Sequence, residues 1–198
     1  MMRYIYPELI FTYSYIYDST MAGVAGKKYG GRAEAEAISY IKRIDKGYSV
    51  LLKDVIKAMP MASGLRWKKR FIEVYISKYA PYSLSVPLTI KIYKDAKLAV
   101  AVLVHELAHN IVFQNRDSIN YKRLFDDFRH EDLTTKYHII EGAILYRLNK
   151  SIFSDGSGGF FIYDKWESPK SDQAYRKAMA IVIREGAENI LKRYISKQ

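Results

Sequence analysis

The segment from residue 96 to residue 114 constrains the fold more than any other part of the chain. Its sequence, AKLAVAVLVHELAHNIVFQ, follows Asp95, which is a typical N-cap residue for a helix. Apolar residues would cover nearly every face of that helix, so it needs partners on all sides. We therefore expect a long, buried helix at the centre of the fold. No uninterrupted apolar run of about 18 residues occurs, so no transmembrane helix is expected.

The remaining chain mixes helical patterns with one clear strand. Residues 86–93 (VPLTIKIY) alternate as a strand does, whereas 65–79 fit both periods, and we favour a helix there. Further predictions are helices over 32–46 (ending at Gly47), 48–59 (ending at Pro60), 133–153 (capped by Asp132, Thr134 or Thr135) and 171–195, and a short strand over 160–163. The fold class predicted is α+β, mainly helical with a small sheet, in a single domain over residues 1–198.

Composition narrows the function classes. The chain is 49% hydrophobic and 27% charged, which is typical of a globular protein and excludes a disordered one. It has no cysteine, so any zinc ion must be held by histidine and carboxylate side chains. The N-terminal residues lack the apolar core and small-residue cleavage site of a signal peptide. We expect a cytoplasmic protein.

The formal net charge of +11 predicts attraction to anionic partners. The densest basic run, Arg66–Phe71 (RWKKRF), mixes cations with aromatic residues and could contact phosphates. The same run suits the solvated outer face of an amphipathic helix, which is the interpretation we favour. Nucleic acid is thus a candidate partner but not the preferred one, and no membrane partner is expected.

A possible metal site lies within the central helix, in VLVHELAHN. His105 and His109 are four residues apart, so on a helix they lie on one face, about 6 Å from each other. That spacing lets both imidazoles bind one zinc ion, and Glu106 projects beside them as a base for a metal-activated water. The pattern HExxH thus supplies two ligands and one general base. The alternative is a core helix whose histidines are satisfied by hydrogen bonds, which is less favoured for all three residues together.

A catalytic zinc ion usually has a third protein ligand. The class with a third histidine in HExxHxxGxxH is excluded, because residues 110–117 contain neither the glycine nor the histidine. The downstream candidates are His130, Glu131, His138, Glu141 and Glu185.

Glu141 begins the segment Glu141–Tyr146 (EGAILY), 141 − 109 = 32 residues beyond His109. This segment resembles the EGxAxY-like stretch of gluzincin-type zinc metallopeptidases: the Glu-Gly pair and the tyrosine match, and the alanine is one position early. The resemblance covers roughly residues 86–150. It implies a zincin-like fold in which the HExxH helix packs against a glutamate-bearing helix, Gly142 allows the close approach, and zinc is bound by His105, His109 and Glu141. Leu145 departs from thermolysin-like enzymes, which carry an aspartate there.

The other candidates remain open alternatives. His138 lies one turn before Glu141 and could replace it as ligand or stabilise the transition state. Glu185 repeats the Glu-Gly-Ala triplet further along the chain, and His130-Glu131 fits a solvated connection.

The expected function is hydrolysis of peptide bonds in a peptide or protein substrate, with Zn²⁺ as cofactor and Glu106 as general base. The oxyanion of the intermediate needs a donor, for which His138, Tyr163 and Tyr175 are candidates. The alternative function is a catalytically inactive protein of the same fold that binds nucleic acid or a protein partner through its basic surface. The first thirty residues are more simply a packed N-terminus than an inhibitory segment.

Overall fold

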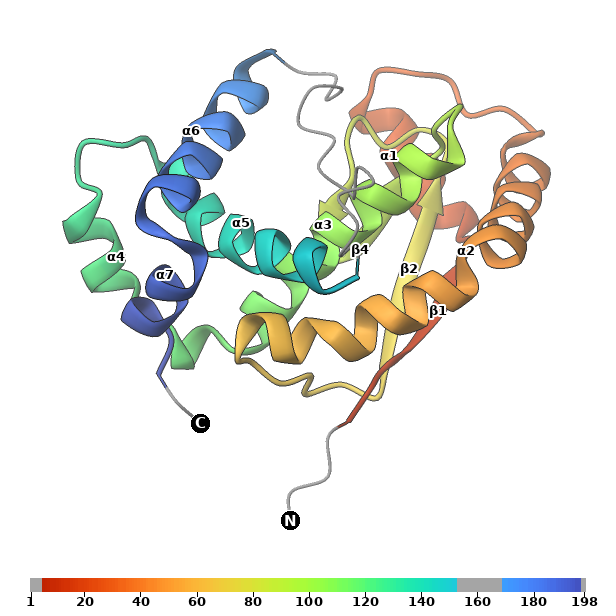
Figure 1. Ribbon diagram of the computed structural model, residues 1–198. Helices are drawn as coiled ribbons and strands as arrows, with labels where there is room; N and C mark the ends of the chain where they lie inside the picture. The colour runs from red at the N-terminus through yellow and green to blue at the C-terminus, as the bar shows by residue number, and fades with distance from the viewer. Residues whose placement is uncertain (1–4, 153–168, 197–198) are drawn as a thin grey trace. The chain divides into compact units, whose positions relative to one another are not determined.

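The computed structural model describes residues 5–152 and 169–196, with side chains from residue 173 in the second range (Figure 1). The chain divides into two compact units, which are described separately. Unit 1 comprises Met1–Lys53 and Trp67–Asn110, and unit 2 comprises Asp54–Arg66 and Ile111–Gln198. The prediction of a single domain over residues 1–198 stays a prediction.

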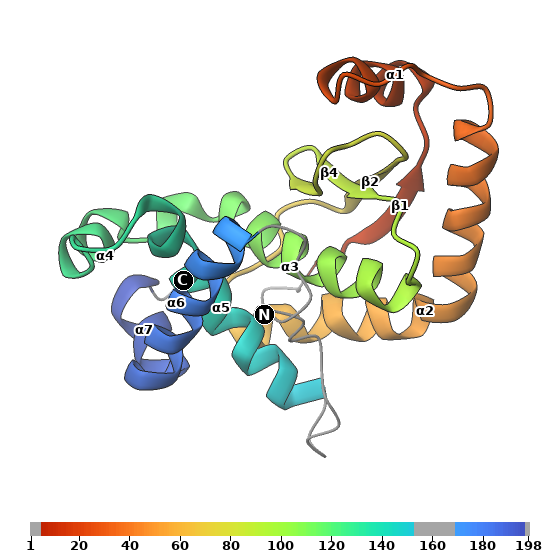
Figure 2. The same ribbon diagram turned by 90° about the horizontal axis from the view of Figure 1, so that it is seen from above.

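Unit 1 contains a mixed four-stranded sheet. Its strands are β1 (Glu8–Thr12), β2 (Phe71–Ser77), β3 (Leu84–Ser85) and β4 (Leu88–Lys91), arranged in the order β1-β2-β4-β3. The pairs β1–β2 and β2–β4 are parallel, whereas β3 pairs antiparallel with β4. Figure 2 shows β1 lying alongside β2. The predicted strand over 86–93 is confirmed in β4, and β1 was not predicted.

The helix favoured for residues 65–79 is wrong, because Phe71–Ser77 forms β2. Ile72, Val74 and Ile76 are buried while Phe71 and Glu73 are exposed, which is the alternation of a strand. Parallel partners on both sides satisfy the backbone of this segment. The helical spacing of its aromatic residues therefore did not decide the structure.

Helix α1 (Tyr15–Val24) was not predicted. Helix α2 (Ala33–Ser63) corrects the predicted helix ends. Gly47 does not end a helix and Pro60 does not stop one, since α2 continues through both positions. Gly47 is exposed, so its cost of about 1 kcal/mol relative to alanine is offset by the apolar side chains buried on either side. The helix ends before Gly64, whose φ of 75° suits only glycine well.

The central helix is confirmed as α3 (Ala96–Gln114). Asp95 caps it, because its Oδ1 accepts a hydrogen bond of 2.8 Å from the backbone N–H of Lys97. By length and composition α3 could cross a membrane, but 72% of its most apolar window is buried inside the structure. A buried core helix has the same properties, and the expected burial of this segment is confirmed.

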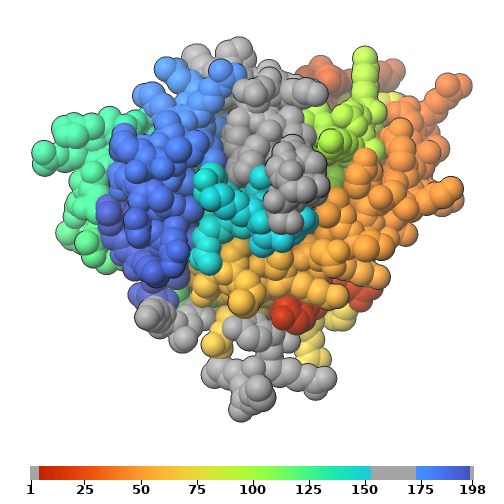
Figure 3. Space-filling view, viewed as in Figure 1, coloured from red at the N-terminus to blue at the C-terminus, as the bar shows by residue number. Residues whose placement is uncertain are grey.

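Unit 2 is helical. It contains a short 3-10 turn (Arg116–Ser118), α4 (Tyr121–Asp127), α5 (Leu133–Ile152), α6 (Pro169–Glu185) and α7 (Ala187–Tyr194). Helix α5 packs against α6 and α7, and the three lie side by side at the surface in Figure 3. The helix predicted over 133–153 is confirmed up to Ile152, and Asp132 is its cap; Phe153 lies outside the described residues.

The single helix predicted over 171–195 is wrong. Gly186 separates α6 from α7 with a φ of 83°, a conformation that glycine adopts readily and other residues rarely do. The short strand predicted over 160–163 lies outside the described residues. With these corrections the described residues are mostly helical with a small mixed sheet, so the α+β class is confirmed.

Candidate metal centre

Helix α3 places two histidines on one face. The Nε2 atoms of His105 and His109 are 2.9 Å apart, and their ring centroids are separated by 4.7 Å. His105 is buried, with 4% of its surface exposed, and His109 is half-buried. In a tetrahedral site with Zn–N bonds of about 2.0–2.1 Å, two ligand nitrogens are about 3.4 Å apart. The observed pair therefore needs only a small shift to bind one ion.

His138, on α5 in unit 2, is half-buried and is a third imidazole that could serve as a metal ligand. Three imidazoles are a ligand set that zinc accepts in catalytic sites. The chemistry of these side chains thus fits the metal expected from the sequence.

The orientation of His138 is fixed by its own helix. Its Nδ1 lies 2.6 Å from the backbone carbonyl oxygen of Thr134, one turn earlier in α5. A carbonyl can only accept, so Nδ1 carries the proton and Nε2 presents its lone pair. Metal-binding histidines typically donate such a hydrogen bond from the ring nitrogen that does not bind the metal, because it fixes both the tautomer and the ring orientation.

Two tyrosines were predicted as candidate oxyanion donors, and Tyr175 is the one that the structure describes. Its ring stands edge-on to that of His138, with the ring centroids 4.1 Å apart. Helix α6 carries Tyr175 and α5 carries His138, so packing between these helices brings the two rings together. Tyr163, the other tyrosine considered, lies outside the described residues.

Glu106 is positioned by strand β3. The glutamate is 7% exposed, and its Oε2 accepts a hydrogen bond of 2.6 Å from the Ser85 hydroxyl. Burial raises the pKa of Glu106 above its ordinary value, while the charge of His109 and the hydrogen bond from Ser85 act in the opposite direction. A carboxylate in such surroundings accepts a proton more readily than one in water.

Glu141 is buried in unit 2, with 3% of its surface exposed. Burial raises the pKa of Tyr121, and the negative charge of Glu141 raises it further. The glycine after it faces α6: a Cβ atom at Gly142 would lie 3.1 Å from Sδ of Met179 and 3.4 Å from Cγ2 of Val182. This glycine therefore allows a close approach of α5 to α6, and its expected role in packing against the HExxH helix stays a prediction.

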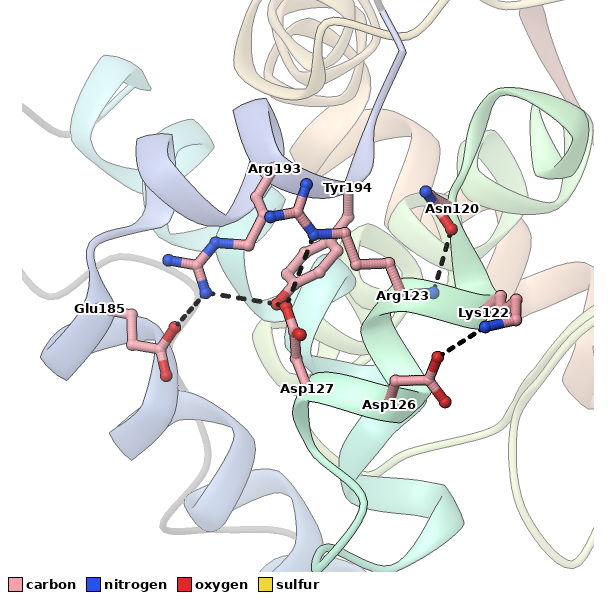
Figure 4. Close-up of polar contacts among 8 residues, drawn as sticks. All are labelled: Asn120, Lys122, Arg123, Asp126, Asp127, Glu185, Arg193 and Tyr194. Atoms are coloured by element: carbon pink, nitrogen blue, oxygen red, sulfur yellow. Dashed lines mark hydrogen bonds and ion pairs between the residues drawn. The ribbon is translucent and has the colours of Figure 1, made fainter.

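The remaining ligand candidates are engaged elsewhere. Glu185 forms an ion pair of 3.1 Å with Arg184. It forms a second ion pair, also of 3.1 Å, with Arg193 (Figure 4). Arg129 donates a hydrogen bond of 3.2 Å to the exposed His130, and Glu131 lies 3.8 Å from the Lys177 ammonium. The partners of these three candidates explain their presence without a metal.

Two polar residues beside the motif were not predicted to take part in the site. Ser85 binds Glu106, and the side-chain amide of Asn110 donates a hydrogen bond of 3.1 Å to the backbone carbonyl of Ser85. Asn110 follows His109 directly and lies four residues after Glu106, which places both on one helix face. That spacing was a signal in the sequence, whereas nothing in the sequence indicated Ser85.

Compared with known proteins, the chain matches no family model, no curated protein and no solved structure at a significant level.

Proposed function

We propose that the chain is a zinc-dependent metallopeptidase of the zincin type that hydrolyses peptides or proteins in the cytoplasm. The observation that carries the proposal is the arrangement on α3, where two histidine nitrogens 2.9 Å apart lie beside a buried glutamate held by Ser85. A purely structural metal site has no need of that glutamate. The resemblance of EGAILY to gluzincins supports the same activity.

His105 and His109 would supply two ligands, and α5 the third. His138 is one candidate for that ligand, because zinc accepts imidazole and the Nδ1 of His138 is already bonded to the Thr134 carbonyl. Glu141 is the ligand that the gluzincin resemblance implies, and it remains the alternative. If Glu141 is the ligand, His138 is left to stabilise the oxyanion, the role first expected for it.

A zinc ion bound there would polarise a peptide carbonyl and lower the pKa of a water molecule. Glu106 would act as general base, accepting a proton from the attacking water and returning it to the leaving amine. Because Ser85 already donates to Oε2, we assign the proton to Oε1 of Glu106. Burial of this carboxylate excludes bulk water, which favours transfer to the amine.

Metal analysis tests the ligand assignment. We expect purified wild-type protein to retain zinc, and His105→Ala to lose it. Loss of zinc in His138→Ala with retention in Glu141→Ala would support the three-histidine set, and the reverse would support the gluzincin set. Glu185→Ala is the matched control, because its glutamate is held by arginines. Zinc binding that is unchanged in the His105 variant would refute the metal site.

Glu106→Gln tests the activity. This variant should bind zinc as the wild type does and hydrolyse a peptide library about 10²–10⁴-fold more slowly, because it lacks the general base. Glu131→Gln removes a carboxylate that pairs with Lys177 and should leave the rate unchanged.

The alternative function rests on the net charge of +11 and on the exposed run Lys68–Arg70. Under that alternative the wild type would cleave no peptide in the library and would bind DNA tightly at physiological salt. Hydrolysis that depends on Glu106 would exclude it.

A further inference from the structure

Ser85 makes two contacts with the face of α3 that carries the HExxH motif. Its hydroxyl donates to Oε2 of Glu106 at 2.6 Å, and its backbone carbonyl accepts from Nδ2 of Asn110 at 3.1 Å. Glu106 and Asn110 are one helical turn apart. One serine is thus held by two successive turns of the same helix.

Strand β3 carries this serine at the edge of the sheet. β3 has two residues and pairs antiparallel with β4, with Ser85 opposite Leu88. Leu88 is buried in the core, so this pairing fixes the position of the Ser85 backbone relative to the core. The sheet and the asparagine together hold the backbone of Ser85, from which the hydroxyl projects, without the help of Glu106.

A glutamate side chain has three rotatable bonds and needs such support to keep one orientation. A carboxylate adjacent to a metal ligand in sequence is attracted to the cation, and if it bound the metal it would no longer serve as a base. A fixed donor on one carboxylate oxygen opposes that movement and leaves the other oxygen for the proton.

We propose that Ser85 is a positioning residue that holds Glu106 in the orientation of a general base and outside the metal ligand set, and that Asn110 fixes Ser85 for this task. This inference rests on the proposed function for its catalytic part. Its structural part, the coupling of Ser85 to Glu106, requires neither metal nor activity.

The coupling is tested in the metal-free protein by a double-mutant cycle. Urea unfolding is measured for wild type, Ser85→Ala, Glu106→Ala and the double variant. A hydrogen bond to a charged group predicts that Ser85→Ala lowers the folding equilibrium constant about tenfold in the wild-type background. The same change should have a clearly smaller effect once Glu106 is replaced. Equal effects in the two backgrounds would overturn the proposal.

Ser83→Ala is the matched control for the cycle. Ser83 lies two residues before Ser85, and its hydroxyl interacts with Tyr93 and the backbone of Lys91 rather than with Glu106. Its effect should be the same with Glu106 present or replaced. A coupling as large as that of Ser85 would show that the cycle reports general loosening, which also overturns the proposal.

The positioning role is tested in the metal-loaded protein. With cobalt in place of zinc, Ser85→Ala should change the visible absorption spectrum, because the released carboxylate alters the coordination of the ion. Ser85→Thr, which keeps the hydroxyl, should restore the wild-type spectrum. A wild-type spectrum in Ser85→Ala would overturn the positioning role, whether or not the protein cleaves peptides.

Kinetics separate this inference from the proposed function. If the wild type hydrolyses peptides, Ser85→Ala should lower kcat by about tenfold or more with little change in KM, and Ser85→Thr should recover most of the rate. An unchanged kcat in Ser85→Ala would overturn the positioning role. If the wild type is inactive while the coupling and the cobalt shift are present, the peptidase proposal fails and the positioning of Glu106 stands.

Discussion

Asp132 caps the helix that carries His138 and Glu141, so its replacement should destabilise the fold. Its Oδ1 accepts from the backbone N–H of Thr135 at 2.9 Å, and its Oδ2 accepts from the Thr135 hydroxyl at 2.6 Å. Replacing an N-cap aspartate with alanine costs about 1 kcal/mol. The variant also loses the hydrogen bond from the buried Thr135 hydroxyl. That hydroxyl can still donate to the carbonyl of Ala174 at 3.4 Å, so the loss of its bond to Asp132 adds only about 0.5 kcal/mol.

Asp132→Ala should therefore lower the free energy of unfolding by about 1.5 kcal/mol at pH 7. For a chain of this size that corresponds to a fall in Tm of about 3–6 °C. Asp132→Asn retains an acceptor for the backbone N–H and should lose much less, since asparagine caps as well as aspartate does. Urea unfolding and thermal unfolding measure both variants.

The cap also predicts a pH dependence. The hydrogen bonds from Thr135, its side chain first, hold the pKa of Asp132 below the ordinary value of 3.8. A lowered folded-state pKa means that the ionised cap stabilises the fold above about pH 4 and that this contribution is lost as the pH falls through the folded-state pKa. The effect is modest because the side chain is exposed and screened by solvent.

The free energy of unfolding of the wild type should therefore approach that of Asp132→Ala as the pH falls from 7 to 3. The difference between the wild type and Asp132→Asn reports only the charge of the carboxylate, and it should also shrink as that charge is lost. The reasoning is refuted if Asp132→Ala costs as much at pH 3 as at pH 7. It is also refuted if Asp132→Asn destabilises the protein as much as Asp132→Ala does at neutral pH.

Two further predictions concern buried polar groups. Asp18 is fully buried, and its Oδ1 accepts hydrogen bonds from the Ser77 hydroxyl at 2.5 Å and from the backbone amides of residues 78–79 at 3.0 and 3.2 Å. Asp18→Ala should therefore lower the free energy of unfolding in urea by about 3 kcal/mol, and Asp18→Asn, which keeps an acceptor, by less. Equal losses in the two variants would contradict the role of the acceptor. Tyr194 donates to Asp127 at 2.7 Å, so Tyr194→Phe should lower Tm by about 2–4 °C, and no change would show that this bond contributes nothing (Figure 4).

The sequence predicted α3 and its cap to the residue, because apolar character, length and Asp95 all indicated the same helix. It misplaced the ends of α2, because Gly47 and Pro60 are local helix-ending signals, and the burial of the apolar face of α2 overrides them. Strand β2 was missed for a related reason. Its alternation was visible, but its pairing with β1, more than fifty residues earlier, is a property of the whole fold.

The candidate site was predictable where chemistry and spacing coincide. His105, Glu106 and His109 lie on neighbouring positions of one helix, so their relation is fixed by helical geometry. Ser85 was not predictable, because its contact with Glu106 joins an edge strand to a helix across twenty-one residues of sequence. No local pattern marks one serine among many for such a contact.

The packing of α3 has a consequence for the tolerance of this stretch to change. Between residues 102 and 110 every side chain is buried except His109, which is half-buried. The apolar positions fill the core, the polar ones form the candidate site, and no position faces solvent in the way that an ordinary surface residue does. A substitution among these nine residues therefore changes either the packing of the core or the candidate site, and only swaps that conserve volume or function should be tolerated. Changes that leave both intact should fall on the surrounding surface.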